Sequence, residues 1–454
     1  MERGSVAFYT LGCKLNYSES STLSRLMKEE GYAIKPFHNA ADFYVINTCS
    51  VTDHADKKCR KVVQQALKKS PMAKVIIVGC YAQLKPEEIA NMEGVDLVLG
   101  AAEKFNLVKH INELSEKTSV AKKGKFISGD IAEVNIFNAA YSMGERTRTF
   151  LKVQDGCDYS CSFCTIPLAR GGSRSNTIEN VISNVQDIAR QGVSEIVLTG
   201  VNIGDFGKLS SAENEETFFE LISELDKIEN IGRFRISSIE PNLLSPEIIE
   251  FVSSSKRFAP HFHIPLQSGS NKILRLMRRR YLRELYADRI EKIKTSMPHC
   301  CIGVDVITGF PGETHEDFLE TYNFLNELDI SYLHVFTYSE RANTHAIELP
   351  GVVPQNIRQQ RTTQLRNLSE KKRRYFYNQF TGTKRVVLFE EETDGEFMYG
   401  FTDNYIKVKT AYDPLLVNEK VFVTLYEVNA EGDMVAGEIH DEVATTFIHQ
   451  EINF

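Results

Sequence analysis

Three closely spaced cysteines are the residues of this chain whose types and spacing most directly suggest chemistry. Cys157, Cys161 and Cys164 follow a C-x3-C-x2-C spacing after an apolar run of strand length. Soft thiolate ligands select zinc or iron–sulfur clusters, and three ligands leave open a metal position that a fourth would close. Structural zinc sites usually come as two separated C-x2-C pairs. The spacing therefore favours an iron–sulfur cluster over a structural zinc with a fourth ligand from elsewhere.

A second set of three cysteines is widely spread in the sequence. Short apolar runs alternate with helical patterns in the first quarter of the chain, which predicts a doubly wound parallel sheet. The strand-like runs are residues 5–12, 42–48, 74–79 and 95–100, with helical patterns at 18–31 and 53–70. Cys13, Cys49 and Cys80 each follow one of the first three runs. We expect them to converge, because the carboxyl ends of parallel strands form the ligand crevice.

Unrelated burial is the alternative for this second set, since free cysteine packs as a small hydrophobe. Three equivalent strand ends make that alternative weaker. Cys59 lies inside a predicted helix, where packing or surface exposure explains it.

The central part of the chain predicts an incomplete parallel barrel of six strand–helix units. Its strand-like runs are residues 149–154, 195–202, 233–241, 261–268, 301–310 and 332–339. Active sites of such barrels lie at the carboxyl ends of the strands, and Cys157, Cys161 and Cys164 follow the first strand. Cys300 and Cys301 begin the fifth strand at its opposite end, so we expect core or surface thiols there.

The last part of the chain has a basic helical pattern followed by short strands. Residues 384–392, 398–410, 420–429 and 433–440 predict a small antiparallel β-barrel. The helical pattern spans residues 357–380, and its cations are Arg358, Arg361, Arg366, Lys371, Lys372, Arg373 and Arg374. A solvated face is the usual meaning of such a run, but interleaved aromatic residues also suit an RNA-facing side. A second basic cluster contains Arg278, Arg279, Arg280 and Arg283.

Composition limits the class of protein and its location. The chain has 454 residues, 42% of them hydrophobic and 25% charged, as in ordinary globular proteins. Its net charge of −8 argues against generalised nucleic-acid binding, so any RNA contact needs a local basic patch. No membrane-length apolar run or secretory signal is evident, so we expect a cytoplasmic protein without membrane contact. There, nine cysteines are metal ligands more often than disulfides.

The motifs resemble one enzyme family over nearly the whole chain. The C-x3-C-x2-C spacing after a strand is the signature of radical S-adenosylmethionine (radical SAM) enzymes. TLGCKLN, VINTCSVT and VGCYAQ resemble the three cysteine motifs of the methylthiotransferase N-terminal domain. GVNIGDFG, HIPLQSGSNKILRLMRRRY and DVITGFPGETHEDF resemble the core of that family, and the last segment resembles its RNA-binding TRAM domain.

This resemblance implies four regions and two 4Fe–4S clusters. The regions are an N-terminal cluster domain at 1–116, a linker at 117–142, a radical SAM core at 143–378 and a TRAM-like barrel at 379–447. Cys157, Cys161 and Cys164 would hold the cluster that binds SAM, and Cys13, Cys49 and Cys80 the second cluster. Among the polar residues at the barrel strand ends, the resemblance assigns SAM contacts to Ser237, Gln267 and Gly309. It implies no catalytic residue beyond the cluster cysteines.

The implied activity is methylthiolation of an unreactive C–H position. Such a carbon has no acidic proton and no leaving group, so acid–base side chains cannot activate it and a radical cofactor must. An electron from the first cluster would cleave SAM to a 5′-deoxyadenosyl radical. The second cluster would hold the sulfur, methylated by another SAM. An external electron donor and a sulfur source are the implied partners.

Three substrates and one non-enzyme function compete. The best match is threonylcarbamoyladenosine beside the anticodon of transfer RNA, because the first cysteine is followed by Lys14-Leu15-Asn16 instead of the Pro-Lys-Asn typical of the ribosomal-protein branch. The alternatives are isopentenyladenosine in transfer RNA, a ribosomal-protein aspartate, and an iron–sulfur RNA-binding or redox-sensing protein. The carboxylate of threonylcarbamoyladenosine needs an arginine or lysine. Arg170 is one candidate, although a structural ion pair explains it equally well.

Overall fold

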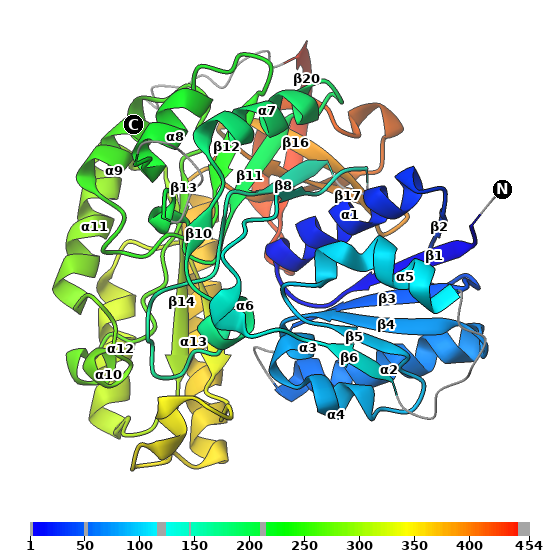
Figure 1. Cartoon of the computed structure of the whole chain (residues 1–454). Helices are drawn as coiled ribbons and strands as arrows, with labels where there is room; N and C mark the ends of the chain where they lie inside the picture. The colour runs from blue at the N-terminus through cyan, green and yellow to red at the C-terminus, as the bar shows by residue number, and fades with distance from the viewer. Residues whose placement is uncertain (1–2, 50–52, 116–123, 145–146, 209–214, 444–454) are drawn as a thin grey trace.

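Three units build the molecule, and the computed structural model describes residues 3–49, 53–115, 124–144, 147–208 and 215–443. Figure 1 shows an N-terminal α/β unit in blue, a central barrel mostly in green, and a C-terminal β-barrel in orange and red behind it. Within these residues, no helix is both long and apolar enough to cross a membrane. All nine cysteines are free of disulfide bonds.

The N-terminal unit is a six-stranded parallel sheet with the strand order β2-β1-β3-β4-β5-β6. Its strands are β1 (Ser5–Thr10), β2 (Ala33–Lys35), β3 (Phe43–Thr48), β4 (Lys74–Gly79), β5 (Leu97–Leu99) and β6 (Lys125–Ile127). The four predicted strands are present. The edge strands β2 and β6 were not predicted, because three partly exposed residues carry no readable alternation.

Helices cover both faces of this sheet, as the doubly wound prediction requires. Phe43 and Val45 pack with α1 (Lys14–Glu29) and α5 (Leu107–Ser115) on one face. Tyr44 and Ile46 pack with α2 (Asp53–Lys69) and α4 (Pro86–Ala90) on the other. Successive residues of a strand point to opposite faces, so β3 contributes to two cores. Cys59 is buried in the second core, which agrees with the packing interpretation.

The predicted linker at 117–142 contains more structure than its polar sequence suggested. Residues 117–123 lie outside the described part of the chain. β6 then joins the N-terminal sheet beside β5, and β7 (Ala140–Tyr141) pairs antiparallel with the first barrel strand. Strands this short draw their stability from the sheet they join, so local sequence does not reveal them.

Six parallel strands form the central barrel, as predicted. They are β8 (Arg148–Lys152), β11 (Glu195–Thr199), β12 (Arg233–Ile236), β13 (His261–His263), β14 (Cys301–Thr308) and β15 (Tyr332–Thr337). They form two sheets, β12-β11-β8-β7 and β13-β14-β15, which the parallel bridges Phe234–Phe258 and Ser238–His263 connect.

Helices follow the barrel strands and cover its outside. They are α7 (Ile178–Ala189), α8 (Phe218–Leu225), α9 (Pro246–Ser254), α10 (Asn271–Leu276), α11 (Arg283–Ser296) and α12 (His315–Glu327). Their apolar faces and the strands form the largest core of the molecule. Cys300 belongs to this core, and Cys301 to the core of the C-terminal unit.

The C-terminal unit is a closed five-stranded barrel that follows the long helix α13 (Gln355–Asn378). Its strands are β16 (Lys384–Thr393), β17 (Phe397–Thr402), β18 (Lys407–Ala411), β19 (Lys420–Val428) and β20 (Met434–Val443). The predicted antiparallel pairing holds except between β18 and β20, which are parallel. A closed ring with an odd number of strands cannot alternate in direction throughout, so one parallel pair is unavoidable.

Candidate metal centres and active-site cavity

Cys13, Cys49 and Cys80 gather at one edge of the N-terminal sheet. Cys13 directly precedes α1, Cys49 follows β3, and Cys80 begins α3 (Cys80–Leu84) directly after β4. A Cβ atom at Gly12 would lie 3.3 Å from Sγ of Cys49. Burial raises the pKa of the Cys80 thiol, and the nearby Cys13 acts in the same direction. The structure thus brings the three predicted residues to one place.

Asn16 ties the loops of this site together. Its Nδ2 donates to the carbonyl oxygens of Leu11 at 3.1 Å and Thr48 at 2.9 Å. Its Oδ1 lies 3.6 Å from Sγ of Cys13. One buried amide therefore positions the loops after β1 and β3. Sequence reasoning missed this role, although Asn16 lies within the quoted TLGCKLN motif.

The other cysteine set lies on the loop between β9 (Gln154–Asp155) and α6 (Ile166–Arg170), at the carboxyl end of the barrel. Each sulfur accepts one hydrogen bond. The donors are the Tyr159 amide to Cys157 at 3.4 Å, the Ile166 amide to Cys164 at 3.4 Å, and Arg279 Nη1 to Cys161 at 3.2 Å. Burial raises the pKa of the Cys157 thiol to about 12 and that of the Cys164 thiol to about 11. These thiols therefore hold their protons more tightly than free cysteine, and a bound metal would be needed to make them thiolates near neutral pH.

The distances between the cysteine sulfurs distinguish a single zinc ion from an iron–sulfur cluster. Zinc–sulfur bonds of 2.3 Å place the sulfurs of a tetrahedral site roughly 3.8 Å apart. In the described part of the chain, the one group of three possible ligand residues with atoms within 4.8 Å of each other is His263, Asp305 and His334. Neither cysteine set is gathered that tightly, so the sets suit a cluster with several irons better than a single zinc ion.

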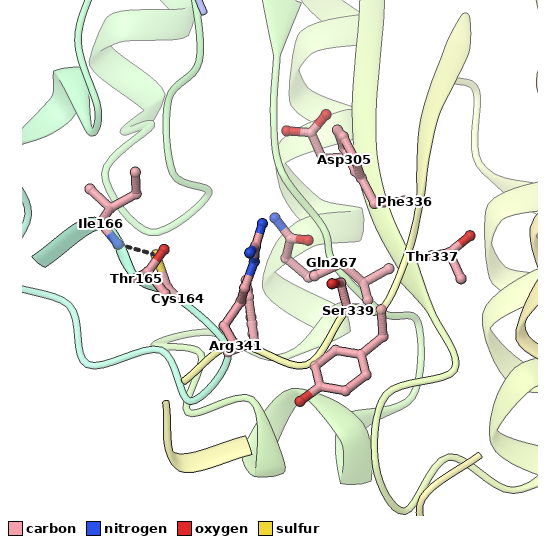
Figure 2. A pocket seen from close by; sticks show the side chains of 12 residues that line it. Cys164, Thr165, Ile166, Gln267, Asp305, Phe336, Thr337, Ser339 and Arg341 are labelled. Carbon is pink, nitrogen blue, oxygen red and sulfur yellow. Dashed lines mark hydrogen bonds between the residues drawn. The ribbon is translucent and has the colours of Figure 1, made fainter. Parts of the chain in front are cut away.

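A cavity of about 250 Å³ lies beside the cluster loop. Figure 2 shows Cys164 and Thr165 on one side of it, Asp305 and Phe336 on another, and the Gln267 and Arg341 side chains pointing toward each other. Oε1 of Gln267 is buried without a hydrogen-bond partner among the described residues. An orphaned acceptor facing a cavity is a ready site for a ligand donor.

The other two predicted SAM contacts are not among the residues that line this cavity. Ser237 is buried at the end of β12, where its amide donates to the carbonyl of Leu198 at 3.2 Å. Gly309 has φ +75°, and a Cβ there would lie 2.3 Å from Cγ of Arg358 on α13. The close approach of α13 accounts for this glycine, and SAM contact by either residue stays a prediction.

Arg341 is a cavity residue that sequence reasoning missed. It follows β15, the sixth strand of the barrel. Its position after the last barrel strand is the signal that could have identified it, because ligands lie at strand carboxyl ends.

Arg170 connects the two cysteine sites. Its Nη1 lies 3.1 Å from Oε1 of Glu19 on α1 and 2.9 Å from Oδ1 of Asp155. Its Nη2 donates to Oδ1 of Asn16 at 2.7 Å. Its residual exposure is 3%, so it is a structural ion-pair partner. The alternative role, binding a substrate carboxylate, is wrong because Arg170 has no free surface to offer.

Comparison with known proteins identifies the family. Residues 5–100 match the model described as "Uncharacterized protein family UPF0004", and residues 151–325 match that of the Radical SAM superfamily. A Bacillus subtilis (strain 168) protein named threonylcarbamoyladenosine tRNA methylthiotransferase MtaB is 40% identical over 451 residues, 96% of this chain and 98% of that protein. The chain belongs to the radical SAM methylthiotransferase family.

Other relatives give a finer comparison within this family. An Aquifex aeolicus protein with the same name is 40% identical over 407 residues, 89% of this chain and 96% of that protein. A Clostridium botulinum tRNA-2-methylthio-N(6)-dimethylallyladenosine synthase is 32% identical over 362 residues, 78% of this chain and 79% of that protein. The radical SAM methyltransferase TsrM from Kitasatospora setae superposes with a TM-score of 0.56 at 13% identity, covering 76% of this chain and 77% of that one. That likeness shows the fold alone.

The basic helix of this methylthiotransferase uses most of its cations internally. Arg358 and Arg361 are buried and form ion pairs with Glu340 and Glu313. Arg374 donates through Nε to Glu370 at 2.8 Å and through Nη1 to the Asn429 carbonyl at 2.9 Å. Arg373 also donates to Glu370, and Lys372 donates to the backbone carbonyls of Asn326 and Leu328. Of the seven predicted cations, Arg366 and Lys371 are the exposed ones.

The second basic cluster is similarly divided. Arg279 is directed inward to Cys161 and to the Glu240 carboxylate. Arg283 pairs with Glu320 at 2.6 Å. Arg280 is exposed, and its guanidinium lies 3.9 Å from the centre of the Tyr159 ring. Arg279 therefore faces the candidate cluster cysteines and is not available to RNA.

Proposed function

We propose that this protein adds a methylthio group to N6-threonylcarbamoyladenosine in transfer RNA, giving the 2-methylthio derivative. The observation that carries this proposal is 40% identity over 96% of the chain to a protein named for that substrate. The dimethylallyladenosine reading has weaker support, because the corresponding relative is 32% identical over 78% of the chain. No relative compared above is named for a ribosomal protein.

Two 4Fe–4S clusters and SAM are the cofactors of the reaction. We assign one cluster to Cys157, Cys161 and Cys164, and the second to Cys13, Cys49 and Cys80. With SAM bound, the first cluster supplies the radical chemistry that an unreactive C–H bond requires. Arg279 donates to Cys161, and the amides of Tyr159 and Ile166 donate to the other two sulfurs, so preformed dipoles face the thiolates.

The cavity beside Cys164 is the proposed SAM site. Oε1 of Gln267 is available to a hydroxyl or ammonium donor, and Arg341 can face the SAM carboxylate. The proximity of Cys164 supports this placement, because SAM must meet the open iron. Ser237 and Gly309 stay candidate contacts, at the ends of β12 and β14.

The two cysteine sites must act on one target carbon, and the fold supports this. α6 follows Cys164, α3 begins at Cys80, and these helices are in contact. Arg170 of α6 also contacts Glu19 and Asn16 of α1, and all three side chains are buried. Their role is to fix the relative position of the sites, since a misplacement of 1 Å is costly in catalysis.

The remaining assignments follow from this activity. The C-terminal barrel is the proposed TRAM-like RNA-binding unit, and the anticodon stem-loop is its ligand. The proposed functional domains are 1–116, 143–378 and 379–447, and β6 from the linker completes the sheet of the first. An external electron donor and a sulfur source complete the partners. Reducing cytoplasm, where transfer RNA and intact clusters coexist, is the proposed location.

Mass spectrometry of transfer-RNA nucleosides from cells lacking this protein tests the proposal. We expect loss of 2-methylthio-N6-threonylcarbamoyladenosine and accumulation of its unthiolated precursor. Unchanged levels of both nucleosides, with loss of the isopentenyl counterpart, would favour the second substrate.

A further inference from the structure

The proposed substrate carries a carboxylate that the alternative nucleoside lacks. In adenine, ring atom N1 lies between C2 and C6, so the carbon that takes sulfur and the N6 substituent share one edge of the base. A cation that binds the threonylcarbamoyl carboxylate must therefore lie close to the sulfur-handling site. A charged hydrogen bond there is worth more than a neutral one.

Two arginines near the cysteine sites do not meet this requirement. Arg170 is buried, and both of its terminal nitrogens already contact Glu19 and Asn16 or Asp155. Arg341 lines the cavity beside Cys164, on the side of the other cysteine set. SAM bound in that cavity, as proposed above, would bring its own carboxylate to Arg341.

Lys14 meets the requirement by its position. It directly follows Cys13 and is the first residue of α1. Its ammonium lies 5.9 Å from the centre of the Phe150 ring on β8. Arg235 on β12, Glu195 on β11 and Tyr405 in the turn between β17 and β18 are also close enough to act on it electrostatically. Parts of all three units thus surround Lys14, yet the residue is exposed to solvent.

The neighbouring arginines already contact carboxylates, whereas Lys14 contacts none in the described part of the chain. Arg148 Nε lies 2.8 Å from Oε1 of Glu390, and Arg235 Nε lies 2.8 Å from Oε1 of Glu195. No carboxylate of the described residues lies within ion-pair distance of the Lys14 ammonium. An anion entering this space would therefore meet, beside Cys13, an ammonium that has no carboxylate partner among the described residues.

We propose that Lys14 binds the carboxylate of the threonylcarbamoyl group and so places C2 against the site of Cys13, Cys49 and Cys80. This inference rests on the proposed function. It also explains selectivity, because an apolar isopentenyl group gains nothing from an ammonium that must give up water to meet it. Lys14 is thus a substrate-binding residue that distinguishes the two nucleosides.

The test varies the residue at position 14 and the carboxylate of the nucleoside, and compares all combinations. Anticodon stem-loops bearing threonylcarbamoyladenosine or its carboxylate methyl ester are offered to the reconstituted wild type, Lys14→Met and Lys14→Arg. We expect the wild type to favour the free acid about ten- to a hundredfold in kcat/KM and in stem-loop binding. Lys14→Met should lose this preference, and Lys14→Arg should retain most of it.

Controls separate loss of charge from damage to the site. Lys28→Met changes an exposed lysine in the last turn of the same helix and should keep the wild-type preference. Iron content and 5′-deoxyadenosine formation should match the wild type in Lys14→Met. Both readouts are independent of carboxylate binding, so a folding or cluster defect is recognised.

Each other outcome has a distinct meaning. If Lys14→Met still prefers the free acid as strongly as the wild type, the inference is overturned while the proposed function stands. If Arg341→Gln loses the preference and Lys14→Met keeps it, the carboxylate lies in the other cavity and the inference is again wrong. If the wild type modifies an isopentenyladenosine stem-loop and neither threonylcarbamoyl form, the proposed function itself fails.

Discussion

Nη1 of Arg170 lies 3.1 Å from Oε1 of Glu19, and this contact joins the two cysteine sites of the molecule. Arg170 ends the helix that follows Cys164, and Glu19 lies on the helix that follows Cys13. Both side chains are buried. Lys104 and Lys152 also contact Oε1 of Glu19, at 2.7 Å and 3.2 Å. A shared carboxylate therefore fixes the two halves of the active centre relative to each other.

Replacing Glu19 with glutamine should destabilise this interface strongly. The change leaves buried cations without their counter-charge, which costs about 3–5 kcal/mol in the free energy of unfolding. Thermal unfolding of the variant measures the loss. The control Glu29→Gln changes an exposed residue at the end of the same helix and should stay within about 0.5 kcal/mol. Equal unfolding temperatures for the two variants would contradict a structural role for Glu19.

The same network predicts how stability depends on pH. Despite burial, which raises it, the pKa of Glu19 is held well below its usual range by Arg170, Lys104 and Lys152. The pKa of Asp155 is lowered in the same way. Carboxyls with lowered folded-state pKa values stabilise the protein above their unfolded pKa of about 4 and lose that contribution as pH falls below it. The free energy of unfolding of the cluster-free protein, measured with denaturant, should therefore fall below about pH 4.5. It should fall less steeply in Glu19→Gln. Parallel pH profiles would argue against this origin.

The two cysteine sets should hold separate clusters. Anaerobically reconstituted protein should contain about eight irons, four for each cubane cluster. Replacing Cys157, Cys161 and Cys164 with alanine should roughly halve the iron and abolish SAM cleavage. Replacing Cys13, Cys49 and Cys80 should roughly halve the iron as well, but 5′-deoxyadenosine should still form without methylthio product.

Buried Cys59 provides the matched control for these variants. Cys59→Ala removes a thiol from the core of the N-terminal unit and should keep the full iron content. Full iron in either triple variant, or zinc in place of iron, would show that the cluster assignment is wrong.

Charge reversals on α13 should fall into two groups, those that lower stability and those that weaken RNA binding. Arg374→Glu should lower the unfolding temperature, because Arg374 joins the helix to the β19–β20 turn. Arg366→Glu and Lys371→Glu change exposed residues, so stability should change by less than about 0.5 kcal/mol. If α13 faces RNA, each exposed change should reduce the salt slope of transfer-RNA binding by about one. If the salt slope of binding is unchanged in both variants, the exposed surface of α13 contacts solvent and does not contact RNA.

The main architecture could be predicted because it depends on local patterns. Alternating apolar runs and helical periods reveal parallel α/β units, and the strand-end rule then places Cys13, Cys49 and Cys80 on one edge. The start of α1 was predicted at residue 18, whereas the helix begins at Lys14, directly after Cys13. The apolar pattern therefore missed the first turn of this helix.

The fate of individual charges could not be predicted, because it depends on contacts far apart in sequence. Arg170 meets Glu19 across 151 positions, and Arg374 meets the Asn429 carbonyl across 55. A basic run looks the same whether its partners are water, phosphate or a distant carboxylate. The same limit applies to Lys14, whose surroundings come from β8, β12 and the C-terminal barrel.

Methylthiolation by the purified enzyme tests the central claim most directly. Reconstituted protein with SAM, a reductant and a sulfide source is offered anticodon stem-loops bearing threonylcarbamoyladenosine or isopentenyladenosine, and nucleosides are resolved by mass spectrometry. The account predicts a 2-methylthio product from the threonylcarbamoyl stem-loop. Methylthio product from the isopentenyl stem-loop alone, or only from a ribosomal protein offered in parallel, would contradict it.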